Sequence, residues 1–168
     1  IEDIYPPVTD IVSELKKLNF DFHKKKILEI GAGTGRTGFK LAELGADVTL
    51  LDYSVNSLKM MRGLADRERS KVKLILADAL NVPFPNNAFD IILHQGLLEH
   101  FKKPFPLLNE NVRLLKPGGY LLIDVPQTFH GYTLMKHGLM LINRWFGGWE
   151  RQFTAGSLKR LLARFQLK

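Results

Sequence analysis

Three acidic residues stand where predicted strands end, and their carboxylates can bind a polar ligand. Glu29 lies near the end of the first predicted strand, Asp52 directly follows the second, and Asp78 follows the third. These strands are predicted at residues 26–30, 47–51 and 72–77. Because open parallel sheets bind ligands at the carboxyl ends of their strands, we expect the three carboxylates to surround one crevice.

A glycine-rich turn follows the first strand. The run ILEIGAGTGRTG, residues 27–38, contains Gly31, Gly33 and Gly35. Glycines let the backbone approach a ligand closely, and the N–H groups at the start of the next helix suit an anion such as a carboxylate. On its own, such a turn also occurs as a purely structural feature and in other nucleotide-binding folds.

Two residues in and beside the turn separate these interpretations. A dinucleotide-binding turn requires glycine or alanine at the position that holds Arg36. Glu29 disfavours a pyrophosphate and suits a cationic group, either by binding an ammonium or by ordering the turn. The pattern therefore favours a ligand that carries both an amine and a carboxylate.

The second and third strand ends suit a nucleoside. Asp52 can accept hydrogen bonds from both ribose hydroxyls, or it can cap the next helix together with Ser54. Tyr53 offers an aromatic face to a purine, or packs in the protein. Asp78 can accept from the exocyclic amine of adenine while the Ala79 N–H donates to the ring, or it is an acid in a surface turn.

Strands and helices alternate along the chain with short connections. Helices are predicted at residues 9–18, 37–44, 54–66, 106–115 and 155–165, and further strands at 89–94 and 120–125, after a turn at 116–119. This alternation predicts an α/β fold, a doubly wound, mostly parallel Rossmann-like sheet flanked by helices. We expect one domain over residues 1–168.

Composition narrows the function classes. The chain has 168 residues, 45% hydrophobic, so a globular domain is expected rather than a disordered chain. It has no cysteine, no apolar run long enough to span a membrane and no signal-peptide pattern, which together favour a cytoplasmic location and predict no metal site. The net charge of +7 leaves nucleic acid open as a partner, although a plain basic surface is favoured.

Four motifs in order resemble the small-molecule class I S-adenosylmethionine-dependent methyltransferases. They are ILEIGAGTGRTG, LLDYS, LADALNVPFPNNAFDIILHQGLLEH and LLKPGGYLLIDVP, within residues 25–126. The resemblance implies that S-adenosylmethionine is the methyl donor and S-adenosylhomocysteine the product. It implies cofactor contacts from Glu29, Gly31, Ala32, Gly33, Asp52, Tyr53, Asp78, Ala79, His94, Gln95 and Gly96.

The resemblance also implies the part of the cofactor that each group contacts. Gly31 to Gly33 border the methionine part, and Glu29 orders their turn. Asp52 binds the ribose, Tyr53 lies against adenine, and Asp78 with Ala79 contacts the adenine edge. His94, Gln95 and Gly96, at the end of the fourth strand, pass near the sulfonium.

Candidate proton acceptors follow the fourth strand. His100 and His94 are the predicted catalytic residues, with Glu99, His130 and Tyr132 behind them. The alternative for each histidine is a helix cap or a packing residue.

The region after the fifth strand departs from the family. Residues 127–154 are rich in aromatic and apolar side chains, which predicts either an acceptor-side lid or a helix packed on the sheet edge. A lid of this kind suits an apolar or amphiphilic acceptor such as a lipid or quinone precursor. The family's last two strands find no counterpart, so the fifth strand is expected to be an edge that residues 127–154 or a partner chain covers, unless the chain is truncated.

The leading hypothesis is therefore methyl transfer to an oxygen, nitrogen or carbon atom of a small molecule. The alternatives are an RNA methyltransferase, suggested by charge alone, and a methyltransferase-like module that binds the cofactor without turnover. A nicotinamide dehydrogenase is disfavoured by Arg36 and Glu29.

Overall fold

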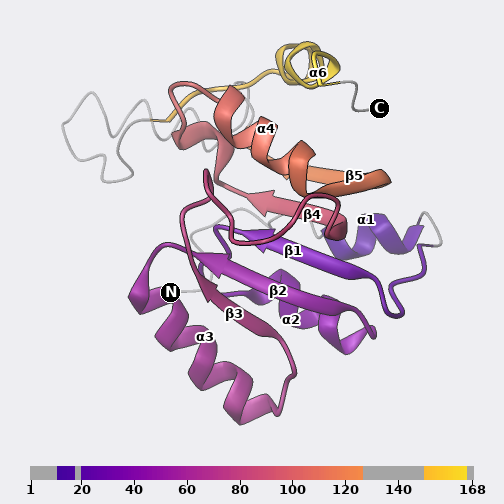
Figure 1. Ribbon diagram of the computed structural model, residues 1–168, viewed down its shortest axis with the longest axis vertical. Coiled ribbons are helices and arrows are strands. Elements are labelled where there is room, and N and C mark those ends of the chain that lie inside the picture. Colours follow the sequence, from indigo (N-terminus) through magenta and orange to yellow (C-terminus); the bar gives the residue numbers. More distant parts are fainter. Residues whose placement is uncertain (1–10, 18–19, 127–149, 166–168) are drawn as a thin grey trace.

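The computed structural model describes residues 11–17, 20–126 and 150–165 and contains one sheet of five parallel strands (Figure 1). The strands are β1 (Lys26–Ile30), β2 (Asp47–Asp52), β3 (Lys73–Leu76), β4 (Phe89–Gln95) and β5 (Leu115–Asp124). Their spatial order is β3-β2-β1-β4-β5, with every neighbouring pair parallel. The chain places β2 and then β3 on one side of β1, and afterwards β4 and then β5 on the other side. The predicted doubly wound α/β fold is confirmed.

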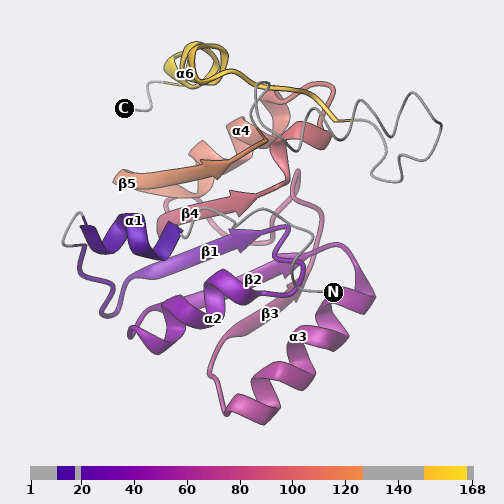
Figure 2. The ribbon, with the colours of Figure 1, turned by 180° about the vertical axis from the view of Figure 1, so that it is seen from behind.

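Helices cover both faces of this sheet. They are α1 (Ile11–Lys17), α2 (Arg36–Glu43), α3 (Val55–Glu68), α4 (Phe105–Leu114) and α6 (Ala155–Ala163), with a short 3-10 helix, η1 (Leu98–His100), after β4. Successive side chains of β1 point to opposite faces. Ile27 packs with residues of α1, α2 and α3, whereas Leu28 packs with Leu114 of α4. Figure 2 shows α1 and α2 lying over the face of the sheet that is hidden in Figure 1.

Local sequence explains where the helices begin. The Ser54 side chain accepts a hydrogen bond from Ser57 N at the start of α3, as a helix cap does. Thr154 and Ser157 form a reciprocal capping box at the start of α6. Both helices lie where the sequence predicts them, to within a few residues at their ends.

The predicted turn at residues 116–119 is wrong as an element, because these residues belong to β5. Phe89 pairs with Leu115, and Ile91 pairs with Tyr120, so the extra residues form a bulge inside the strand. Gly118 has φ +77°, and a Cβ at Gly119 would lie 2.8 Å from the Asp90 carbonyl oxygen. The glycines therefore permit a close approach of two strands rather than a reversal of the chain.

Residues 153–165 pack beside β5, which forms an edge of the described sheet. Phe153 and side chains of α6 cluster with Leu98 of η1, Leu107 of α4 and Ile123 of β5. The predicted lid falls largely on residues 127–149, outside the described residues, and residues 150–154 connect to α6. No helix in the described ranges has the length and apolarity needed to cross a membrane.

Candidate functional site

The glycine-rich turn stands at the carboxyl end of β1, beside the end of β2. Gly31 and Gly33 have φ values of +67° and +55°, which side chains rarely tolerate. Ala32 N donates to the Leu51 carbonyl oxygen at 3.0 Å, tying the turn to β2. The position of a Cβ at Gly33 has no atom within 4 Å, so the surface there is open.

Asp52 clamps this turn from the end of β2. Its buried carboxylate accepts from Gly33 N through Oδ2 and from Ser54 N through Oδ1, each at 2.8 Å. A carboxylate has about four lone-pair sites, so these two bonds leave acceptor capacity for hydroxyl groups. The arrangement combines the two interpretations of Asp52, because it stabilises the start of α3 and also positions a carboxylate next to the open turn.

Glu29 orders the opposite side of the turn. Its buried Oε2 accepts a hydrogen bond of 2.8 Å from Gly38 N, the third residue of α2. Burial raises the pKa of the Glu29 carboxyl to about 7, although the bond from Gly38 N opposes this shift. Of the two roles considered for Glu29, ordering the turn matches this contact.

Gly38 is a constrained residue that the sequence analysis missed. A Cβ there would overlap the Leu50 side chain and lie 2.7 Å from Glu29 Oε2. The available signal was a glycine inside a predicted helix, where it costs about 1 kcal/mol relative to alanine. Such a glycine usually has a packing reason, which here is the approach of α2 to β1 and β2.

Tyr53, Asp78 and Ala79 lie around the ends of β2 and β3. Tyr53 is 82% exposed, so it does not pack in the core and presents its ring to solvent. Asp78 is exposed, and its Oδ1 accepts from Leu80 N at 2.9 Å, as expected of an acid in a surface turn. Ala77 N donates to the Asp52 carbonyl oxygen at 3.2 Å, which brings the start of this turn beside Asp52. Ala79 is half-buried.

Gln95 and Gly96 connect the end of β4 to its neighbours. Gln95 Oε1 accepts from Thr37 Oγ1 at 2.6 Å, and Gln95 Nε2 donates to Asp124 Oδ2 at 3.4 Å. Gly96, with φ +63°, donates its N–H to the Asp124 carbonyl oxygen at 3.0 Å. These bonds join the start of α2 to β4 and β5 at the carboxyl ends of the strands.

The side chain of His94 lies in the core and not at the open carboxyl ends of the strands. Its side chain is 0% exposed, and Nε2 is 3.2 Å from Asn111 Nδ2 on α4. Burial lowers the pKa of His94 to about 4, so the ring is neutral near pH 7. The structure thus places the imidazole between β4 and α4, while the backbone of His94 continues toward Gly96.

η1 carries two of the remaining candidate proton acceptors, His100 and Glu99, whereas His130 and Tyr132 lie outside the described residues. His100 is exposed, whereas Glu99 is 2% exposed. Glu99 Oε1 lies 3.6 Å from the position of a Cβ at Gly96, and Oε2 has no hydrogen-bond partner among the described residues. Burial raises the pKa of Glu99, and Glu150 and Asp124 add to this, against His100 and a backbone hydrogen bond. From the sequence, Glu99 ranks below the histidines as a proton acceptor, because the sequence shows that it follows the fourth strand but not that it is buried.

Residues 28–123, from β1 to β5, match the family model described as a methyltransferase domain. The chain belongs to this methyltransferase family. The matched segment contains the glycine turn, Asp52, Asp78 and the end of β4. Members of this methyltransferase family are class I enzymes, for which S-adenosylmethionine is the methyl donor. The family resemblance inferred from the four motifs is confirmed.

The methyltransferase domain is similar to curated enzymes over part of their length. It is 36% identical over 99 residues to demethylmenaquinone methyltransferase of Paenarthrobacter aurescens, covering 59% of this chain and 38% of that protein. It is 36% identical over 117 residues to the enzyme of the same name from Clavibacter sepedonicus, covering 66% and 47%. The chain thus spans less than half the length of these relatives. They give no support to the RNA methyltransferase or non-catalytic alternatives.

A solved structure supports the fold of the methyltransferase domain independently of sequence. The crystal structure of the YcgJ protein from Bacillus subtilis superposes with a TM-score of 0.76 at 21% identity. The superposition covers 95% of this chain and 68% of that one. The predicted Rossmann-like arrangement therefore agrees with a protein of low sequence identity.

Proposed function

We propose that this protein transfers a methyl group from S-adenosylmethionine to an oxygen, nitrogen or carbon atom of a small-molecule acceptor. The observation that carries the proposal is the contact of Asp52 with Gly33 N, which fixes a carboxylate beside an open glycine turn. The family match and the demethylmenaquinone methyltransferase relatives support the same reaction class. S-adenosylmethionine, when bound, supplies a methyl group already activated on a sulfonium.

The chain's own residues would hold the donor along the strand ends. Gly31, Ala32 and Gly33 would border the methionine part, with Glu29 keeping their turn in shape. Asp52 would accept from the ribose hydroxyls. Fit with the residues present is good, because Asp52 is ordered by backbone N–H groups before any ligand binds, which reduces the cost of binding.

The adenine would lie beside the ends of β2 and β3. Tyr53 offers an exposed ring for stacking, and Asp78 with Ala79 lies beside the end of the neighbouring strand. Gln95 and Gly96 would pass near the sulfonium, with the backbone of His94 behind them. The bonds of Gln95 to Thr37 and Asp124 support this role, since they hold the end of β4 against the start of α2, which follows the glycine turn.

His100 is the proposed proton acceptor on the acceptor side. It is exposed and follows β4 directly, whereas the His94 ring is buried and neutral. We assign the His94 side chain a positioning role, through Asn111, for the strand that carries Gln95 and Gly96. The acceptor is proposed to be an apolar or amphiphilic molecule of the quinone type, as the names of the relatives indicate.

Binding and turnover test the two parts of the proposal separately. Calorimetry with S-adenosylmethionine, S-adenosylhomocysteine and NAD should show binding of the first two and not of NAD. Transfer of a labelled methyl group should then favour lipophilic quinols over polar metabolites in a panel of acceptors. Binding of NAD alone would contradict the donor assignment, and exclusive methylation of a polar metabolite would contradict the acceptor class.

A further inference from the structure

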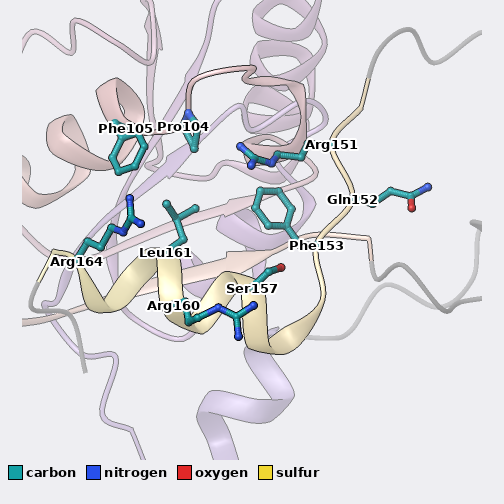
Figure 3. A pocket seen from close by; sticks show the side chains of 9 residues that line it. All are labelled: Pro104, Phe105, Arg151, Gln152, Phe153, Ser157, Arg160, Leu161 and Arg164. Atoms are coloured by element: carbon teal, nitrogen blue, oxygen red, sulfur yellow. The ribbon is translucent and has the colours of Figure 1, made fainter.

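A concave site lies between the start of α4 and α6, and no residue of the glycine turn lines it (Figure 3). Its volume is about 530 Å³, within the range of small-molecule sites. Residues 104–105 form one wall, residues 151–153 a second, and α6 the third. None of these residues belongs to the strand ends assigned to the methyl donor.

The pocket combines aromatic and aliphatic surface. Phe153 is buried in the cluster that joins α4 and α6, whereas Phe105 is 40% exposed although it is a large apolar residue. Leu161 of α6 lies between the side chains of Arg151 and Arg164 in Figure 3. An exposed phenyl ring beside a leucine gains from covering by an apolar group.

Three arginines surround this apolar surface. Arg151, Arg160 and Arg164 line the pocket, and its lining contains no acidic residue. The Arg151 guanidinium lies 5.6 Å from the centroid of Phe153, and that of Arg164 lies 5.7 Å from the centroid of Phe105. Figure 3 shows these two groups extending toward the pocket from opposite sides. Within the described ranges, no carboxylate forms an ion pair with any of the three arginines.

We propose that this pocket binds a single anionic amphiphile, with its phosphate or similar oxyanion at the guanidinium groups of Arg151 and Arg164 that flank the pocket and its apolar body on Phe105 and Leu161. Guanidinium groups match oxyanions through paired hydrogen bonds, so two of them favour a phosphate over a neutral head group. Stacking on the phenyl rings holds both arginines partly in place before binding, which lowers the ordering cost. The apolar floor distinguishes this ligand from inorganic phosphate.

Calorimetric titration of the full chain with dodecyl phosphate, below the concentration at which it forms micelles, tests the proposal. Saturable binding is expected, with much weaker binding of inorganic phosphate and of the neutral dodecyl maltoside. The double variant Arg151→Gln, Arg164→Gln should bind dodecyl phosphate about tenfold more weakly or worse. Both side chains are exposed, so the variant should keep the circular dichroism spectrum and melting temperature of the parent.

The matched control is Lys59→Gln, Arg62→Gln on α3, which removes the same charge far from the pocket in the sequence and on another helix. It should leave the affinity for dodecyl phosphate unchanged. An equal loss in both double variants would overturn the proposal, because general attraction to a basic protein would explain it. Binding to phosphatidylglycerol vesicles without binding of monomeric dodecyl phosphate would also overturn it, in favour of a membrane surface.

Discussion

Glu29 and Glu99 are both buried carboxyl groups near the ends of central strands, yet their surroundings differ. Glu29, on β1, accepts a hydrogen bond from Gly38 N, and the nearby Asp52 accepts two more from backbone groups. Glu99, after β4, has one oxygen without a partner among the described residues. Burial raises the pKa of both glutamates. The Glu29 carboxyl accepts a hydrogen bond from the backbone of another residue, Gly38, whereas the backbone bond that lowers the pKa of Glu99 comes from Glu99 itself.

The contrast extends to neighbouring side chains. In the described part of the chain, the buried side-chain atoms without a partner are His94 Nδ1, Glu99 Oε2 and Asn111 Oδ1, all on β4, η1 or α4. Buried polar groups are normally hydrogen-bonded. The β1–β2 end of the site is therefore complete in the sense that none of its described, buried side-chain N or O atoms lacks a partner, although Asp52 keeps lone pairs for the hydroxyl groups of a ligand. The β4–η1 end keeps hydrogen-bonding capacity for a ligand or for a further part of the protein.

The largest effect is expected from Gly38→Ala, which disturbs the packing of α2 at the β1–β2 end of the site. The added Cβ meets Leu50 and Glu29 Oε2, so the free energy of unfolding should fall by about 3 kcal/mol, at the upper end of the usual cost of overpacking. Gly63→Ala is the matched control, because it is an exposed helical position with nothing near its Cβ, and should gain about 0.5–1 kcal/mol. Chemical denaturation measures both. Equal stability of the two variants would remove the argument for a tight α2–β1 contact.

A smaller effect is expected from Glu29→Gln, and it depends on pH. A carboxyl whose pKa is raised from 4.5 to about 7 stabilises the fold fully below pH 4.5, and this contribution is lost as the pH rises to about 7. The shift corresponds to about 3 kcal/mol at most. Glutamine keeps an oxygen that can accept from Gly38 N but does not titrate.

The difference in unfolding free energy between the variant and the parent should therefore move in favour of Glu29→Gln between pH 5 and pH 8. Taking this difference cancels the opposite dependence of His94, whose lowered pKa stabilises the fold above pH 6.5 and loses that contribution as the pH falls toward 4. Denaturant titrations at several pH values measure it. A difference that stays constant with pH would contradict the buried, proton-holding state of Glu29.

The smallest effect is expected from Tyr53→Ala. The ring is exposed, so the melting temperature should not change, while loss of stacking should weaken S-adenosylhomocysteine binding by about 1 kcal/mol. Tyr120→Ala is a suitable control, since Tyr120 is also exposed but lies on β5. Calorimetry compares the two. Unchanged affinity in Tyr53→Ala would move adenine away from the end of β2.

The sequence predicted the strand ends well because short buried strands followed by glycine, aspartate or serine carry strong local signals. The position of Asp52 at the end of β2 and the Ser54 cap could be inferred for this reason. The β5 bulge could not, because Pro117-Gly118-Gly119 has the composition of a reversal and only the partner strand shows that the chain continues. The surroundings of His94 and Glu99 could not be predicted either, because His94 contacts Asn111 of α4 and the Glu99 carbonyl oxygen accepts from Arg151 N, and the sequence pattern does not show these contacts.

Binding of S-adenosylhomocysteine to the parent chain, Asp52→Ala and Glu99→Gln, measured by calorimetry, tests the two-ended description of the site most directly. We expect Asp52→Ala to lose about 1–3 kcal/mol of binding free energy, because a charged acceptor at the complete end is removed. Glu99→Gln should bind the product like the parent, because Glu99 Oε2 forms no hydrogen bond with the residues assigned to the donor. Equal losses in both variants, or full affinity in Asp52→Ala, would contradict the account.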